Sequence, residues 1–134
     1  MGDWKAIDHT ADVALRIQAT SLPDLFETAA HGMFALCAEM DVTQPEITLS
    51  VALIALDAET LLVDWLNELL YLAERESCAF TRYDFAVCTS TQLQATVYGY
   101  PITAYLTYIK AATFHNLAIR VTADGYATEI VLDT

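Results

Sequence analysis

SLPDLFETAAHGMFALCAEM, residues 21–40, is the clearest helical pattern in the chain. Ser21 is a typical N-cap, Pro23 falls in the first turn and Asp24 occupies the third helical position. Apolar residues recur at helical spacing after the cap, at Leu22, Leu25, Phe26, Ala29, Met33, Cys37 and Met40. The pattern predicts an amphipathic helix, and its apolar face needs another layer of structure to cover it.

A second helix is expected after Asp57, because leucines and Trp65 repeat on one face as far as Ala73. The remaining segments alternate in polarity or are rich in aromatic and β-branched residues, which favours strands. The expected strands are 13–18, 47–51, 80–87, 92–98, 105–114, 117–121 and, after the turn at Asp124-Gly125, 126–133. We predict an α+β fold with two helices packed on one face of a largely antiparallel β-sheet.

Length and composition indicate one domain over residues 1–134, because 55% of the residues are hydrophobic and no Gly/Ser-rich or Pro-rich linker divides the chain. The longest apolar runs fall short of the roughly 18 residues that a membrane-spanning helix needs. Residues 1–5, MGDWK, lack the features of a secretory signal. We therefore expect a soluble, cytoplasmic protein without membrane contact.

The chain is strongly acidic, with 18 Asp and Glu against 6 Lys and Arg and a formal net charge of -12. This charge repels a phosphate backbone, so direct nucleic-acid binding is not expected. It would attract a divalent cation or a basic protein surface, although solubility alone is an equal explanation. Phosphate-loop and dinucleotide motifs are absent, so autonomous nucleotide binding is not expected either. Cys37, Cys78 and Cys88 lie in apolar patterns and are interpreted as buried, reduced thiols.

Residues suited to metal binding stand near both ends of the sequence. The stretch His9-Thr10-Ala11-Asp12-Val13, preceded by Asp8, puts a histidine and two carboxylates just before a predicted strand, and Asp133 follows an apolar strand. Oxygen donors from Asp12 and Asp133 would suit calcium or magnesium, and a histidine with two acids would also fit a softer divalent metal. The alternative is that Asp12 caps a turn and Asp133 is an exposed carboxylate.

Two further polar residues are candidates. Lys110 is the only cation in the long apolar stretch between Arg82 and Arg120. It could pair with the carboxylates or bind a phosphate as a point charge, or it could be a solvent-facing strand residue. His115 is interpreted first as a turn residue, with a metal ligand and a titrating group as alternatives.

Four motifs in this sequence resemble those of the archease family. They are HTADV at 9–13, LPDLFETAAHGMF at 22–34, KAATFH at 110–115 and IVLD at 130–133, and together they cover essentially the whole chain. The resemblance implies a small α+β protein that assists an RtcB-type RNA ligase. It would promote guanylylation of the ligase and its multiple turnover in tRNA splicing or RNA repair, and the ligase itself would do the chemistry.

The resemblance also implies particular residues. A divalent cation, which is calcium in structures of the family and could be magnesium or manganese here, would be held by Asp12 and Asp133. Thr134 and His9 are further candidates for that site. Lys110 and His115 would serve in ligase activation and not as catalytic residues.

The sequence departs from the family pattern after Gly99. Where the family has G-E-P and a longer polar loop with a histidine, this chain has Gly99-Tyr100-Pro101 and a short apolar connection at 102–106. An acid and a histidine are missing there, so a ligand or partner contact made by that loop would differ. The alternative functions are a metal-dependent phosphoesterase and a metal-independent, chaperone-like interaction module, and the oligomeric state is left open.

Overall fold

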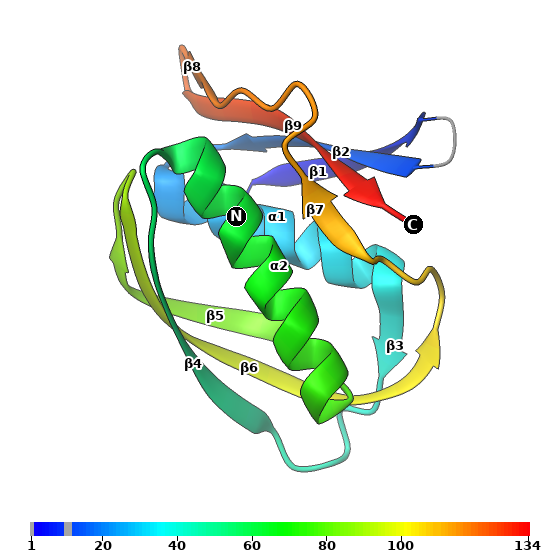
Figure 1. Cartoon of the computed structure of the whole chain (residues 1–134). Helices are drawn as coiled ribbons and strands as arrows, with labels where there is room; N and C mark the ends of the chain where they lie inside the picture. The colour runs from blue at the N-terminus through cyan, green and yellow to red at the C-terminus, as the bar shows by residue number, and fades with distance from the viewer. Residues whose placement is uncertain (1, 10–11) are drawn as a thin grey trace.

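The structure is a computed structural model that describes residues 2–9 and 12–134, with Asp8 and His9 described by their backbone alone. Two helices lie between two antiparallel sheets (Figure 1). The helices are α1 (Leu22–Cys37) and α2 (Ala58–Glu76). The strands are β1 (Asp3–His9), β2 (Asp12–Ala19), β3 (Ala38–Met40), β4 (Ile47–Ile54), β5 (Cys78–Cys88), β6 (Gln92–Tyr105), β7 (Ala111–Thr113), β8 (Arg120–Thr122) and β9 (Gly125–Asp133).

The predicted class is confirmed, since the chain folds into two helices and antiparallel strands. The strands form two sheets, however, and not the single sheet that was expected. One sheet has the order β1-β2-β9-β7, with β8 also paired to β9, and in the other β6 pairs with β3, β4 and β5. Both helices contact strands of both sheets, so their apolar faces are covered from two sides.

Local sequence explains where the helices begin. The Ser21 hydroxyl accepts a hydrogen bond from the Asp24 N–H at 3.2 Å, and the Asp57 carboxylate accepts one from the Thr60 N–H at 2.8 Å. Each cap satisfies a backbone donor that has no partner within its helix. Helix α2 ends at Ser77, whose φ of 52° is left-handed. Both helix starts agree with the sequence prediction.

The first helix ends earlier than its apolar spacing predicts. Ala38 is extended, and residues 38–40 form β3, which pairs with the far end of β6. A short apolar run fits a buried strand as well as a helix. Here residues 38–40 form a strand because they pair with the end of β6. Strand β1 was not predicted, and it pairs with β2 as the outer strand of its sheet.

The predicted strand 105–114 is divided in the structure. Tyr105 ends β6 in one sheet, Ala111 begins β7 in the other, and residues 106–110 carry the chain between them. The N–H groups of Leu106 and Thr107 both donate to the Cys37 carbonyl, at 2.8 and 3.3 Å. The predicted strand is therefore interrupted where the chain passes from one sheet to the other. The spacing of apolar residues does not predict such a change of sheet.

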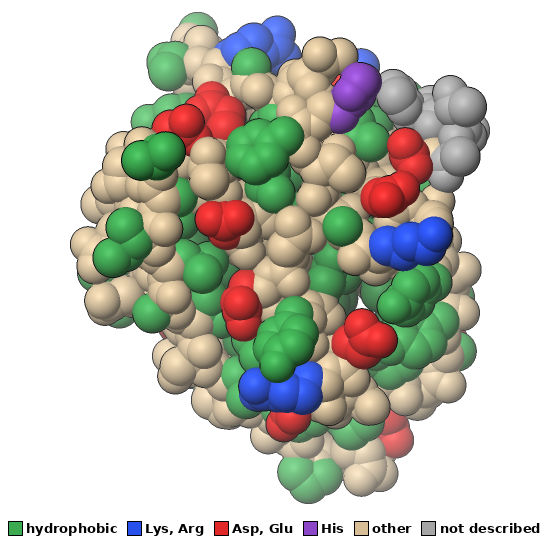
Figure 2. Space-filling model, in the orientation of Figure 1, with side chains coloured by type: hydrophobic (Ala, Val, Ile, Leu, Met, Phe, Trp, Pro, Cys, Tyr) green, Lys and Arg blue, Asp and Glu red, His purple; other side chains and the backbone are tan. Residues whose placement is uncertain are grey.

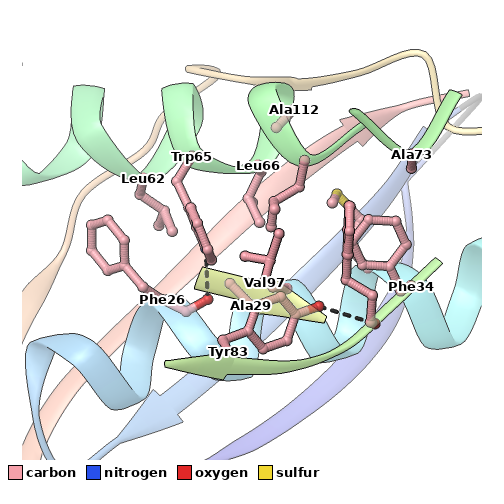
Figure 3. Close-up of a cluster of buried hydrophobic side chains, with 14 of the residues drawn as sticks. Phe26, Ala29, Phe34, Leu62, Trp65, Leu66, Ala73, Tyr83, Val97 and Ala112 are labelled. Atoms are coloured by element: carbon pink, nitrogen blue, oxygen red, sulfur yellow. Dashed lines mark hydrogen bonds between the residues drawn. The ribbon is translucent and has the colours of Figure 1, made fainter. Parts of the chain in front are cut away.

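Large side chains from both helices and both sheets meet in one core (Figure 3). Trp65 is fully buried, and its indole N–H donates to the Phe26 carbonyl on α1 at 3.0 Å. The Tyr83 hydroxyl donates to the Phe80 carbonyl at 3.1 Å. These bonds satisfy the polar ends of two aromatic rings inside an apolar environment.

All three cysteines are free thiols, as predicted; Cys37 and Cys78 are buried and Cys88 is half-buried. Burial raises the pKa of Cys78 and of Cys88 to about 11, so both stay protonated near neutral pH. In the part of the chain that the structure describes, neither helix is long and apolar enough to cross a membrane.

Candidate metal site

Two predicted metal ligands, Asp12 and Asp133, stand at the ends of adjacent strands. Asp12 begins β2 and Asp133 ends β9, and the antiparallel register of these strands pairs Val13 with Leu132. The pairing ends there, and Asp12 and Asp133 are the next residue on each strand; continued in the same register, they would lie opposite each other. Residues that face each other in this way have Cβ atoms about 4.5–5.5 Å apart. Two carboxylates at that separation suit a shared cation.

Strand alternation turns both carboxylates away from the helices. Leu15 and Ile17 on β2 and Ile130 and Leu132 on β9 are fully buried, and they face the core. The odd-numbered residues of β2 and the even-numbered residues of β9 take that face, so Asp12 and Asp133 take the opposite one. Asp12 is half-buried and Asp133 is exposed.

No ion pair among the described residues engages Asp12 or Asp133. On the same face, Glu129 is paired with Arg16 across β9 and β2, with 3.5 Å between Oε2 and a guanidinium nitrogen. Carboxylate oxygens are the donors that calcium and magnesium prefer.

Lys110 is joined to Asp133 through the backbone. Its N–H donates to the Asp133 carbonyl at 2.8 Å, and the next residue, Ala111, is the register partner of Asp133. The Lys110 side chain is exposed and lines a groove that also includes Glu74 on α2. None of the described ion pairs includes Lys110, so its predicted pairing with the carboxylates stays a prediction.

His115 lies in the turn after β7, as its first interpretation proposed. Its N–H donates to the Thr113 hydroxyl at 3.4 Å, and its ring Nε2 lies 3.4 Å from the Asn116 side-chain amide. The ring lines a shallow hollow together with Glu129 and Val131. Alternation along β9 puts Val131 and Asp133 on the same face, so His115 and Asp133 share one side of the sheet.

The other predicted metal residues are less completely described. The backbone of His9 pairs with Asp12 across β1 and β2, while its side chain lies outside the described part. Residues 10 and 11 of the HTADV motif also lie outside it. Thr134 directly follows Asp133 and is half-buried. Within the side chains that are described, no three His, Cys, Asp or Glu residues gather as a metal cluster, so the metal site at Asp12 and Asp133 stays a prediction.

Asn67, which was not among the predicted functional residues, holds the strand next to the candidate site. Its side-chain oxygen accepts from the Ala112 N–H at 2.8 Å, and its amide donates to the Ala112 carbonyl at 3.1 Å. Asn67 interrupts an otherwise apolar helix face between Leu66 and Leu69. A polar residue in that position signals a buried hydrogen-bond partner, but not which backbone it binds.

The archease protein family (MTH1598/TM1083) matches residues 4–134 of this chain. The archease of Methanosarcina acetivorans is 33% identical over 138 residues, which cover 97% of this chain and 94% of that protein. The archease of Archaeoglobus fulgidus is 31% identical over 134 residues, covering 97% and 98%.

Solved structures agree with this comparison. A Thermotoga maritima crystal structure, described as an archease and possible chaperone, has a TM-score of 0.71 and 26% identity over 97% of this chain and 96% of that one. The solution structure of Methanobacterium thermoautotrophicum protein 1598 has a TM-score of 0.68 and covers 98% of both chains, and at 23% identity it supports the fold alone. Sequence motifs, fold and relatives agree over nearly the full length, and the chain belongs to the archease protein family.

Proposed function

We propose that this chain is a metal-binding accessory protein that activates an RtcB-type RNA ligase, promoting its guanylylation and multiple turnover in tRNA splicing or RNA repair. One observation carries the proposal: in a member of the archease family, Asp12 and Asp133 stand at adjacent strand ends with both carboxylates on one face. The ligase performs the reaction, and this chain activates the ligase.

The proposed cofactor is a divalent cation, calcium first, with magnesium or manganese as alternatives. Asp12 and Asp133 would hold it, and Thr134 and His9 are the further candidates. The donor chemistry fits, because two carboxylates supply hard oxygen ligands and balance the charge of a divalent ion. When bound, the ion would supply positive charge that stabilises phosphate oxygens.

Lys110 is proposed to act beside the carboxylates. The hydrogen bond from its N–H to the Asp133 carbonyl fixes the base of a long, flexible side chain next to the candidate site. Its ammonium group is a compact point charge that suits a phosphate. His115, in the turn on the Asp133 side of the sheet, is the second residue proposed to serve in activation.

The charge of the chain supports a protein partner over direct RNA contact. A formal net charge of -12 repels the phosphate backbone and attracts basic protein surfaces. The same charge weighs against a phosphoesterase, because only 6 Lys and Arg in the whole sequence are available to hold a phosphate ester.

A metal-independent, chaperone-like module is the second candidate function. The Thermotoga maritima structure is described as a possible chaperone, and this chain exposes several large apolar side chains, including Tyr105, Leu106 and Tyr108. In that case the carboxylates would be dispensable, which separates the two functions experimentally.

The test is ligase guanylylation from GTP, measured with no added protein, with the wild-type chain, and with Asp12→Asn or Asp133→Asn. We expect the wild type to accelerate guanylylation and each variant to lose about tenfold or more of that effect, because one metal ligand is removed. Asp124→Asn is the matched control, since Asp124 is exposed at the other end of β9.

Equal rates for wild type, Asp12→Asn and no protein would contradict the proposal. Full activation by Asp12→Asn and Asp133→Asn, with the wild type also active, would instead favour the metal-independent module. Calcium titration by calorimetry separates the two steps, because a loss of metal binding should accompany the loss of activation.

A further inference from the structure

A groove lies between the C-terminal half of α2 and the chain that crosses from β6 to β7. We call it the tyrosine groove; its volume is about 190 Å³, and the residues that matter below are Tyr71, Glu74, Ile102, Tyr105, Tyr108 and Lys110. Figure 2 shows this side of the molecule, where hydrophobic, acidic and basic side chains lie next to one another over the lower half of α2. Ile102 and Tyr105 contribute to this groove from the C-terminal end of β6.

Large apolar side chains are exposed around the tyrosine groove. The exposed fraction is 58% for Tyr71, 51% for Tyr105, 56% for Leu106 and 52% for Tyr108. The rings of Tyr105 and Tyr108 meet edge to face, with 6.1 Å between centroids, and the Arg75 guanidinium lies 5.7 Å from the Tyr71 ring. Contiguous exposed apolar surface with a polar rim is typical of binding sites, and Tyr and Arg are enriched where binding energy concentrates.

The segment 106–110, which carries Tyr108 between β6 and β7, is held in place although it belongs to no strand. The Cys37 carbonyl accepts from Leu106 and Thr107 at one end, and the Asp133 carbonyl accepts from Lys110 at the other. Between them, Ile109 is buried, with 4% exposed. A surface ordered before binding loses less conformational entropy when a partner arrives, so the tyrosines are suited to recognition.

The volume of the groove and the net charge of the chain restrict the kinds of molecule that could bind there. Small-molecule sites usually enclose about 300–1,000 Å³, which is more than this groove offers. The net charge of -12 disfavours nucleic acid and also a second copy of the chain. A segment of another protein with one large apolar side chain fits the small volume, and such a segment need not carry negative charge.

Among the described residues that line the groove, Glu74 is the one acid and Lys110 the one base. Glu74 is exposed on α2 and lines the groove near Tyr105. The pKa of Tyr105 is raised, first by burial of the hydroxyl and then by the neighbouring Cys37 and Glu74. Lys110 lines the groove on the side next to Asp133, where it would repel a cation of the partner. A Lys or Arg of the partner is therefore expected to lie beside Glu74.

We propose that the tyrosine groove is a protein-docking site that takes an apolar anchor side chain flanked by Lys or Arg. This inference rests on the proposed function in one respect, because it assigns the segment to the RtcB-type ligase. The inference gives the two surfaces different roles. The tyrosine groove binds the ligase, and Asp12 and Asp133 act on it. Lys110 connects them, since its side chain lines the groove and its N–H binds the Asp133 carbonyl.

The experiment measures the Kd between the full chain and the purified RtcB-type ligase of the same organism, by biolayer interferometry in low salt. Tyr105→Ala with Tyr108→Ala, and separately Glu74→Lys, should each weaken binding about tenfold or more. Leu56→Ala removes a 93% exposed apolar side chain just before α2, and Asp124→Lys makes the same charge change as Glu74→Lys at another exposed site. Both controls should bind within about twofold of wild type.

Wild-type affinity in both groove variants would overturn the docking inference and leave the metal proposal intact. Absence of any binding by the wild-type chain would overturn the proposed ligase partnership, and with it this inference. Conversion of a wild-type dimer to monomer by the groove variants, seen by sedimentation velocity, would identify a self-interface and also overturn it. Because Glu74→Lys changes an exposed side chain, a folding defect would not explain its effect, and circular dichroism checks this.

Discussion

The side chain of Asn67 on α2 binds both main-chain polar groups of Ala112 on β7. Strand β7 is only three residues long and forms one edge of its sheet. The two hydrogen bonds therefore fix the edge strand to the helix layer, directly between the two candidate activation residues, Lys110 and His115.

Replacement of Asn67 by Ala should lower the free energy of unfolding by about 1–3 kcal/mol, because it leaves the Ala112 N–H and carbonyl without their partner. Urea unfolding followed by circular dichroism measures this. Gln94→Ala, at an exposed position on β6, is the control and should stay within about 0.5 kcal/mol of wild type. An Asn67→Ala protein as stable as that control would show that water replaces the side chain fully.

Trp65→Phe should destabilise the chain by about 1–3 kcal/mol, since it removes the buried hydrogen bond to the Phe26 carbonyl and leaves space beside Tyr83. Trp4→Phe serves as the comparison. Trp4 is 37% exposed, so this substitution should lower the free energy of unfolding by less. Intrinsic fluorescence supplies an independent check: the blue-shifted emission should belong to Trp65. Equal losses of stability in the two variants would contradict this account of the core.

Stability should fall as pH drops below about 6.5, in part because of His31. Burial against the Tyr83 ring, 5.1 Å away between centroids, lowers the pKa of His31, and the charge of Glu27 opposes this only partly. The unfolded chain then binds the proton more tightly than the folded one, so stability is lost as pH falls through the unfolded value toward the folded pKa. His31→Gln should unfold with a smaller difference between pH 7.5 and 5.5 than wild type, and an unchanged difference would exclude His31 as a source.

Lys110→Met should reduce ligase activation about tenfold or more without changing the unfolding midpoint, because the ammonium is lost while the backbone bond to Asp133 is kept. Lys5→Met on β1 removes another exposed lysine and should be neutral. Calcium affinity, measured by calorimetry, should change far less than activation. Unimpaired guanylylation with Lys110→Met would remove this residue from the proposed mechanism.

The helices were predictable because their signals are local. Ser21 and Asp57 cap the helices where their sequence says, and the apolar spacing identifies the buried faces. The ends of elements were less predictable. Residues 38–40 continue the helical spacing but pair with β6, and residues 106–110 continue a strand-like pattern but cross between sheets.

The candidate site could be predicted in part. Residue types and the family resemblance named Asp12 and Asp133, but their adjacency depends on the pairing of β2 with β9, which is non-local and has no signature in either strand. The same limit hid Asn67, whose partner Ala112 lies in a distant segment. Such relationships come from topology, and topology is decided by the packing of the whole chain.

Strand β9 also determines the order in which the molecule can assemble. Hairpin β5–β6 and the capped helices form from neighbouring residues, whereas β9 must close nearly the whole described chain to reach β2. Contacts between distant segments carry a larger loop-closure cost, so this pairing is expected to be the slow step of folding. A nascent or partly folded chain would then contain its hairpin and helices while β2 remains without its partner strand β9, leaving the buried faces of both strands open to solvent.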